Sequence, residues 1–151
     1  MKSPFAYYGG KMGMAPQIVS LMPEHRVYIE PFFGSGAVLL AKPPAPFEIV
    51  NDLDQALVTF WKVLRERTAE LDMVCSLTPH SRVEYMRADL DADGLDELEV
   101  ARRFWVRVNQ SFSATANRNT GWSITKATQQ SKPAAMMSRL GRFGRVAERL
   151  V

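Results

Sequence analysis

Hydrophobic and polar positions follow two different patterns along the chain. In the first part, residues 27–33 and 47–51 are nearly continuous apolar runs, as expected of parallel strands that are covered on both faces. Short helices are expected before and between these strands, over residues 16–22 and after Gly36, because prolines close both segments. Together these elements indicate that residues 1–70 form the start of a domain of the α/β class.

Helical spacing of apolar residues marks three later segments of the chain. Residues 71–99, which lie between the first two of them, hold turn signals and an acidic cluster. Asp52 or Asp54 can cap a helix whose apolar stripe is expected to cover one face of the sheet. The members of this stripe are Leu57, Phe60, Trp61 and Leu64. A second helix is expected over residues 96–108 and a third over residues 131–151, each with apolar residues along one side and arginines along another.

The charges are unevenly distributed along the chain. Residues 1–101 contain 9 lysines and arginines against 15 acids, whereas residues 102–151 contain 10 against the single acid Glu148. A strongly basic last third favours a polyanionic partner. Four arginines of the last helix form a basic stripe, expected either to contact phosphate or to be an ordinary solvated face: Arg139, Arg142, Arg145 and Arg149.

Composition narrows the class of protein. A chain of 151 residues, 46% apolar and 23% charged, is expected to fold as one domain with a hydrophobic core. The sequence has no apolar segment long enough to cross a membrane, and its first residues lack the apolar stretch of a signal peptide. Cys75 is the only cysteine, and two histidines offer little for a metal site. We therefore expect a cytoplasmic protein without a metal.

The strongest functional signal lies at the end of the first strand. A Gly-Ser-Gly turn at residues 34–36 opens a short helix, so the backbone there can approach a ligand closely. Asp52 ends the next strand 18 residues after Gly34, close to the roughly 20 residues at which an acid meets ribose hydroxyls in nucleotide-binding βαβ units. This spacing predicts a cofactor that contains a nucleoside.

Two loops add candidate binding groups. Residues 5–11 combine aromatic rings, two glycines and Lys11, and are expected either to meet a ligand or to form a turn with exposed aromatics. Residues 109–122 are rich in amides and hydroxyls that can read base edges, with aromatics that can stack on bases. An ordinary polar surface loop is the alternative. The residues predicted to contact DNA are Arg107, Asn109, Gln110, Arg118, Asn119, Trp122 and Lys126.

Three of these segments together resemble the Dam-type DNA adenine methyltransferases. They are Tyr-Tyr-Gly-Gly-Lys at residues 7–11, Ile-Glu-Pro-Phe-Phe-Gly-Ser-Gly at 29–36 and Asn-Asp-Leu-Asp at 51–54, and they match the first three blocks of that family in order and spacing. Residues 83–85 and 117–121 resemble its helical target-recognition region more loosely. The resemblance therefore covers essentially the whole chain.

The resemblance implies a fold and a division of the chain. The fold would be of the α/β class, a partial Rossmann-like, S-adenosylmethionine-dependent methyltransferase fold with a helical DNA-recognition region. Residues 1–70 would form the amino-terminal part of the cofactor-binding domain and residues 71–135 the target-recognition region. Residues 136–151 would form a basic helix that leads back toward the catalytic part.

An activity and a cofactor site are implied as well. Members of the family transfer a methyl group from S-adenosylmethionine to the exocyclic amine of adenine in double-stranded DNA, as in restriction–modification, and flip the target base. Tyr7 would pack on the cofactor, Lys11 would reach the cofactor or its surroundings, and Asp52 would hold the ribose hydroxyls. The implied cofactor-binding residues are Tyr7, Lys11, Glu30, Phe32, Gly34, Gly36 and Asp52.

One block of the family is missing from this sequence. The catalytic Asp-Pro-Pro-Tyr tetrapeptide is absent, and the Pro-Pro pair at residues 43–44 lacks both partners. No catalytic residue is therefore assigned. The chain is expected to be the amino-terminal part of a methyltransferase: a truncated product, half of a split enzyme whose second polypeptide supplies the block, or a degenerate copy. An uncovered edge strand and uncovered apolar helix faces are expected to make the chain poorly soluble or dependent on a partner.

Two other functions agree with part of the sequence. A DNA-binding or cofactor-binding module without catalysis agrees with the basic last third and the missing block, and predicts DNA affinity that falls with salt. A nicotinamide-dependent protein agrees with the strand–turn–helix alone. The third glycine of that fingerprint is missing, and residues 5–11 would have no role in it.

Overall fold

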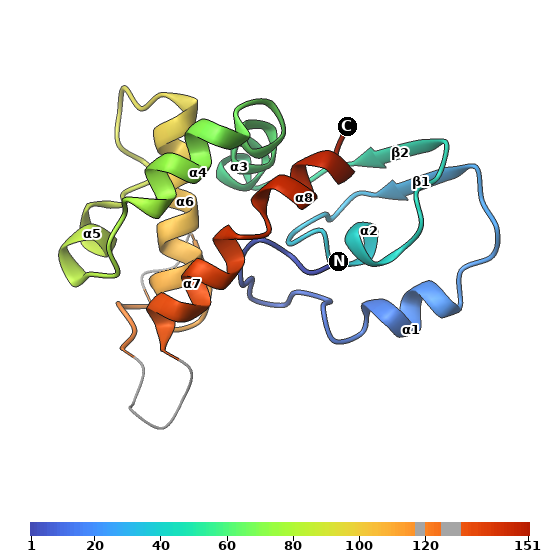
Figure 1. The fold of residues 1–151 in the computed structure, drawn as a ribbon, viewed down its shortest axis with the longest axis horizontal. Coiled ribbons are helices and arrows are strands. Elements are labelled where there is room, and N and C mark those ends of the chain that lie inside the picture. Colours follow the sequence, from blue (N-terminus) through green and yellow to red (C-terminus); the bar gives the residue numbers. More distant parts are fainter. Residues whose placement is uncertain (117–119, 125–130) are drawn as a thin grey trace.

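The computed structural model describes residues 1–116, 120–124 and 131–151 (Figure 1). A small α/β part lies at one end of the molecule and a helical part at the other, and α8 reaches from the helical part toward β2. The elements in chain order are α1 (Ala15–Ser20), β1 (Val27–Glu30), α2 (Ala37–Ala41), β2 (Phe47–Val50), α3 (Gln55–Glu66), α4 (Thr68–Ser76), α5 (Arg82–Arg87), α6 (Glu97–Gln110), α7 (Lys132–Leu140) and α8 (Phe143–Arg149).

β1 and β2 form a two-stranded parallel sheet, and α2 is the crossover between them. The register runs residue for residue from Val27 and Phe47 to Glu30 and Val50. Both predicted strands are therefore present. The first ends before residues 31–33, because Pro31 has no N–H to donate to a ladder and begins the turn instead.

One face of this sheet is open to solvent. The alternate side chains Val27, Ile29, Phe47 and Ile49 are between 52% and 61% exposed. The prediction that the helix after Asp54 covers one face of the sheet is wrong, because α3 packs mainly against α6, with the centre of the Phe60 ring 5.5 Å from that of the Phe104 ring. Asp54 does cap α3, accepting hydrogen bonds from the first free N–H groups of that helix.

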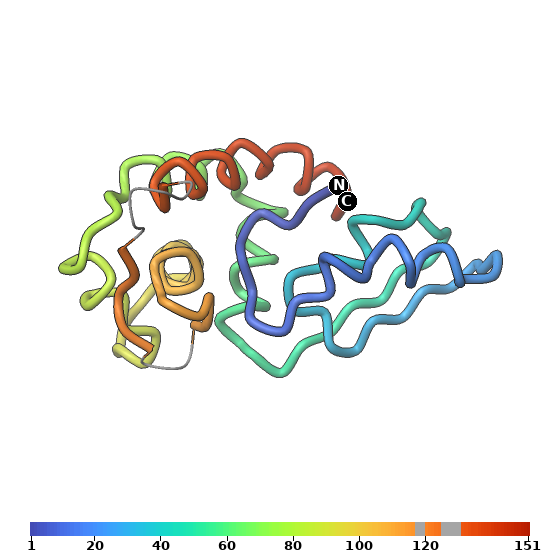
Figure 2. Tube along the Cα trace, turned by 90° about the horizontal axis from the view of Figure 1, so that it is seen from below, coloured from blue at the N-terminus to red at the C-terminus, as the bar shows by residue number. Residues whose placement is uncertain are grey.

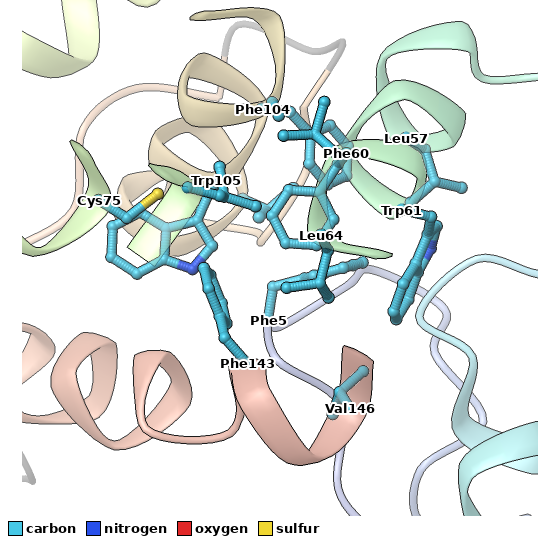
Figure 3. Close-up of a cluster of buried hydrophobic side chains, with 14 of the residues drawn as sticks. Phe5, Leu57, Phe60, Trp61, Leu64, Cys75, Phe104, Trp105, Phe143 and Val146 are labelled. Carbon is cyan, nitrogen blue, oxygen red and sulfur yellow. The ribbon is translucent and has the colours of Figure 1, made fainter. Parts of the chain in front are cut away.

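The core lies between α3, α6 and α8 (Figure 3). Phe5 is fully buried there, with its ring edge-on to Phe60 and Phe104 at centroid distances of 5.0 and 5.3 Å. The residues just before Tyr7 are thereby anchored. Cys75 lies in the same core and is 1% exposed (Figure 3). The predicted stripe of α3 is buried in it: Leu57, Phe60, Trp61 and Leu64.

The later helices agree with the apolar periodicity except at one glycine. α6 begins after the cap Asp96, as predicted. The helix predicted over residues 131–151 is divided at Gly141 into α7 and α8, which follow one another along one side of the molecule (Figure 2). Glycine costs about 1 kcal/mol in a helix, and the break lets α7 pack on α4 and α6 while α8 packs on α3 and α4.

In the part of the chain that the structure describes, no helix is long and apolar enough to cross a membrane. No group of histidine, cysteine, aspartate and glutamate side chains among these residues could hold a metal ion.

Candidate functional site

The turn after β1 is built around two glycines in left-handed conformations. Gly34 has φ 49° and Gly36 has φ 63°, and the Gly36 N–H donates to the Phe33 carbonyl (2.9 Å). A Cβ atom at Gly36 would lie 2.8 Å from the Phe33 ring, and one at Gly34 would lie 3.3 Å from the Tyr7 ring. Both positions therefore favour glycine strongly, and the bare turn can be approached closely by other groups.

The acid at the end of β2 is tied to this turn. The Asp52 carboxylate accepts hydrogen bonds from the Gly34 N–H (2.8 Å) and the Asp54 N–H (3.1 Å). The indole N–H of Trp61 donates to the Gly34 carbonyl (3.0 Å), so α3 holds the turn as well. The carboxyl ends of two parallel strands meet here, which is where open α/β sheets bind their ligands.

Tyr7 forms an aromatic wall of the site. Its ring lies against Gly34, and its carbonyl accepts a hydrogen bond from the Gly10 N–H (3.1 Å), which closes the loop. Burial, followed by the negative charges of Asp54 and Asp52, raises the pKa of the Tyr7 hydroxyl to about 12. The hydroxyl therefore stays protonated at neutral pH and can donate a hydrogen bond.

A lysine and a buried acid lie beside the turn. Lys11 Nζ is 3.2 Å from Glu30 Oε1 and donates to the Phe32 carbonyl (3.3 Å). The Tyr28 hydroxyl donates to Glu30 Oε2 (2.7 Å), and burial together with this bond raises the pKa of Tyr28. The Glu30 side chain is only 7% exposed and the Lys11 side chain is 40% exposed, so the ion pair joins a buried acid to a lysine at the solvent edge of the site.

A cavity of about 210 Å³ lies among these residues. Five of the seven predicted cofactor residues line it, while Glu30 and Gly36 lie behind them. Phe32 lines the cavity and is 70% exposed, so it also borders solvent. The lining residues are Tyr7, Gly9, Gly10, Lys11, Phe32, Phe33, Gly34, Ser35, Ala37 and Asp52.

Six residues that shape this site are not among the seven predicted cofactor residues. Five of them line the cavity: Gly9, Gly10, Phe33, Ser35 and Ala37. The position of Ser35 between two glycines is a signal that could have identified it. Trp61 was assigned only to the apolar stripe, although its indole N–H also holds the turn. A second cavity, of about 510 Å³, borders Phe33 and Asp52 and lies beside β2, α3 and α8.

Asn109 and Gln110, which were predicted to contact DNA, are fully buried at the end of α6. The Asn109 amide donates to the Trp105 carbonyl (2.8 Å) and accepts from Arg139 (2.8 Å). The Gln110 amide accepts from the Ser81 N–H (3.1 Å) and donates to a backbone carbonyl (2.9 Å). The structure corrects the expectation for these two residues, because their amides are used inside the protein and do not face a base.

Arg107 and Trp122 are only partly buried. The Arg107 guanidinium lies 4.8 Å from the centre of the Tyr85 ring, and its Nε donates to the Ala116 carbonyl (3.1 Å). The Trp122 ring lies 5.2 Å from the His80 ring. Both side chains therefore border the loop that follows α6. The other predicted DNA contacts lie outside the described residues: Arg118, Asn119 and Lys126.

Three of the four arginines in the predicted basic stripe are bonded within the protein. Arg139 donates to the Asn109 amide oxygen (2.8 Å). Arg142 donates to the Ser3 carbonyl (2.8 Å), and Arg149 donates to the Glu48 carboxylate (2.6 Å). Arg145 is exposed. The stripe is therefore mainly a set of internal anchors that fasten α7 and α8 to the rest of the molecule.

Glu48 is the centre of a charge cluster that joins β2 to α8. Its carboxylate lies 2.5 Å from Lys42 Nζ and 2.6 Å from an Arg149 nitrogen. Burial alone would raise the pKa of Glu48, but hydrogen bonds from Arg149, Lys42 and the Ala45 N–H lower it to about 2. Lys42 Nζ also lies 4.7 Å from the centre of the Tyr28 ring. The cluster thus fixes α8 beside the sheet.

Comparisons with known proteins point to one family. Residues 7–135 match the family of D12 class N6 adenine-specific DNA methyltransferases. A DNA N-6-adenine-methyltransferase of Escherichia phage P1 is 36% identical over 70 residues, which make up 46% of this chain and 9% of that protein. A type II methyltransferase of Lactococcus lactis subsp. cremoris is 27% identical over 128 residues, which make up 78% of this chain and 44% of that protein.

These matches confirm the resemblance indicated by the three motif segments. The chain spans less than half the length of either curated relative, at 9% and 44%. The family match nevertheless extends over most of this chain, from the Tyr7 loop through the region that follows α6. The chain therefore belongs to the D12 class N6 adenine-specific DNA methyltransferase family.

Proposed function

We propose that this chain binds S-adenosylmethionine and serves an adenine-specific DNA methyltransferase. The observation that carries the proposal is the cavity beside Gly34, where an aromatic ring, an ion pair and an acid converge on a glycine turn. When bound, the cofactor supplies an electrophilic methyl group on a sulfonium, which the exocyclic amine of adenine takes up as it loses a proton.

The residues around the cavity fit the parts of this cofactor. Asp52 keeps lone pairs beyond the two N–H groups from which it accepts, and a carboxylate suits ribose hydroxyls. Glu30 Oε1 is buried within ion-pair distance of Lys11 but accepts no hydrogen bond from the described residues. It can therefore accept from a ligand ammonium, and Lys11 can meet the carboxylate of the same amino acid group.

The size of the cavity suggests that the cofactor extends beyond it. Its volume of about 210 Å³ is below the roughly 300–1,000 Å³ of typical ligand clefts. Phe32 is 70% exposed, and Leu53, directly after Asp52, is 84% exposed. We place the adenine ring of the cofactor against these uncovered apolar side chains.

Calorimetric titration with S-adenosylhomocysteine tests the proposal without requiring catalysis. We expect saturable one-to-one binding that NAD does not displace. Binding of NAD in place of S-adenosylhomocysteine would favour the nicotinamide alternative, and binding of neither compound would contradict a nucleoside site.

We further propose that β1, α2 and β2 begin a larger, Rossmann-like parallel sheet. The open face formed by Val27, Ile29, Phe47 and Ile49 supports this, because such apolar positions are covered in parallel sheets. The molecule exposes 8989 Å², against about 7,700 Å² expected for a folded protein of 17.0 kDa. In the working enzyme, further protein that carries the Asp-Pro-Pro-Tyr block would cover this face.

For the DNA partner, we propose that residues 71–135 form the recognition region beside the cofactor part. The loop after α6 is closed by a bridge between Ser111 and Trp122, and Phe112 within it is 75% exposed. An exposed aromatic ring on an anchored loop is suited to stacking on bases. The proposed contacts with DNA are Arg107, Phe112, Arg118, Asn119, Trp122, Lys126 and Arg145.

A binding module without catalysis is the second candidate. It is favoured by the absence of an Asp-Pro-Pro-Tyr tetrapeptide from the 151 residues. Incubating the chain with duplex DNA and labelled S-adenosylmethionine separates the two functions. We expect no incorporation by this chain alone, and salt-sensitive DNA binding. Robust incorporation would show that other residues of this chain present the adenine.

A further inference from the structure

The loop of residues 7–11 contacts both the cofactor cavity and the recognition region. Toward the cavity, the Tyr7 ring lies against Gly34. Away from it, the Tyr8 N–H donates to the Ala114 carbonyl (3.0 Å), in the segment that follows α6. The Tyr8 side chain is 66% exposed and does not line the cavity. One short loop therefore joins two segments that are far apart in the sequence.

The segment around Ala114 is firmly held. Ala114 has φ 53°, in the left-handed region that no other non-glycine residue adopts within the described part of the chain. The Ser111 hydroxyl accepts from the backbone N–H that follows Ala114 (3.0 Å), and Arg107 donates to the Ala116 carbonyl (3.1 Å). Such a conformation persists where its surroundings determine it, so the Ala114 carbonyl is presented from a fixed position.

The loop on the other side of this hydrogen bond is more weakly held. Tyr8, Gly9 and Gly10 are all exposed, and glycines give the backbone there wide freedom. Exposed segments with few buried contacts open at low free energy. A ligand that packs on the Tyr7 ring and favours the closed loop therefore also favours the hydrogen bond to Ala114.

We propose that the hydrogen bond from Tyr8 to Ala114 couples cofactor binding to DNA binding. The inference rests on the proposed function of both regions. In this proposal the loop has two states, closed on Ala114 and open. The cofactor favours the closed state through Tyr7, and DNA favours it through the segment after α6 that accepts the hydrogen bond from the Tyr8 N–H. Coupling between two sites is reciprocal, so each ligand raises the binding affinity of the other ligand by the same factor. One hydrogen bond supports a factor of about twofold to tenfold.

A matched pair of variants at Tyr8 isolates the hydrogen bond. Tyr8→Ala removes the side chain and keeps the N–H, whereas Tyr8→Pro removes both. The affinity for S-adenosylhomocysteine is measured by calorimetry with and without a saturating, short adenine-containing DNA duplex. We expect DNA to tighten binding about twofold to tenfold in the wild type and in Tyr8→Ala, and to have no effect in Tyr8→Pro.

The outcomes separate this inference from the proposed function. If both ligands bind the wild type with independent affinities, or if Tyr8→Pro keeps the coupling, the inference is overturned and the proposed sites stand. If S-adenosylhomocysteine does not bind the wild type, both the proposed cofactor site and the coupling are contradicted. Should Tyr8→Pro fail to fold by circular dichroism, Ala114→Gly and Ala114→Val decide. Glycine accepts φ 53° and should keep the coupling, whereas β-branched valine should abolish it.

Discussion

The Asp52 carboxylate stabilises the fold by accepting a hydrogen bond from the Gly34 N–H. The same carboxylate keeps lone pairs that can accept hydrogen bonds from the ribose hydroxyls of the proposed ligand. We expect Asp52→Ala to weaken S-adenosylhomocysteine binding by about tenfold to hundredfold, because hydrogen bonds to charged groups contribute about 1.5–3 kcal/mol. Calorimetry measures the loss. Asp72→Ala, at an exposed position of α4, is the control. If the two variants bind S-adenosylhomocysteine with equal affinity, Asp52 does not contact the ligand.

Gly36 illustrates how a single missing Cβ atom shapes the turn. At φ 63° and 2.8 Å from the Phe33 ring, an added Cβ atom meets both strain and a clash. We expect Gly36→Ala to lower the free energy of unfolding by about 1–3 kcal/mol. Gly144→Ala in α8, where nothing lies within 4 Å, should raise it by about 1 kcal/mol. Urea unfolding compares them, and a stable Gly36→Ala would mean that the turn can relax.

Between elements, the Glu48 cluster makes the attachment of α8 to β2 depend on pH. The pKa of Glu48 is lowered from 4.5 to about 2 in the folded chain. The stabilisation is therefore fully present above pH 4.5 and is lost as the pH falls through 2. We expect the free energy of unfolding to decline across this range in the wild type.

Glu48→Gln should remove that part of the pH dependence. At neutral pH it should lower the free energy of unfolding by about 3 kcal/mol, because Lys42 stays buried without its carboxylate. Glu66→Gln, an exposed change on α3, should leave stability nearly unchanged. The measurement is urea unfolding at several pH values. A variant with the same pH profile as the wild type would show that Glu48 does not titrate in this range.

The motifs and the longer helices with an apolar stripe could be predicted because each depends on nearby residues. The short helices α4 and α5 were not predicted individually. The turn at Gly34 and Gly36 is set by its own glycines, and α3 by its cap and its apolar stripe. Gln110 and Arg149 could not be placed, since their partners Ser81 and Glu48 lie 29 and 101 residues away. The residue type alone does not show whether an amide or a guanidinium side chain is buried or exposed.

For the whole molecule, the open face of the sheet should govern behaviour in solution. Contiguous exposed apolar side chains promote association. We expect the double variant Ile29→Thr and Ile49→Thr to associate less than the wild type, because threonine suits a strand but reduces the apolar surface. Sedimentation velocity over a concentration series measures this. Leu21→Thr, which changes a separate leucine that is 78% exposed, is the control. A wild type that stays monomeric throughout would contradict the prediction.

The single cysteine of the chain is a natural reporter of how the molecule opens. Burial raises the pKa of the Cys75 thiol, and at 1% exposure a reagent reaches it only after the helical core has opened. The rate of labelling by a thiol-reactive dye therefore gives the population or the rate of that opening. If Gly36→Ala, in the distant turn, speeds labelling in proportion to its lost stability, the α/β part and the helical core unfold as one cooperative unit. If labelling is unchanged, they open separately.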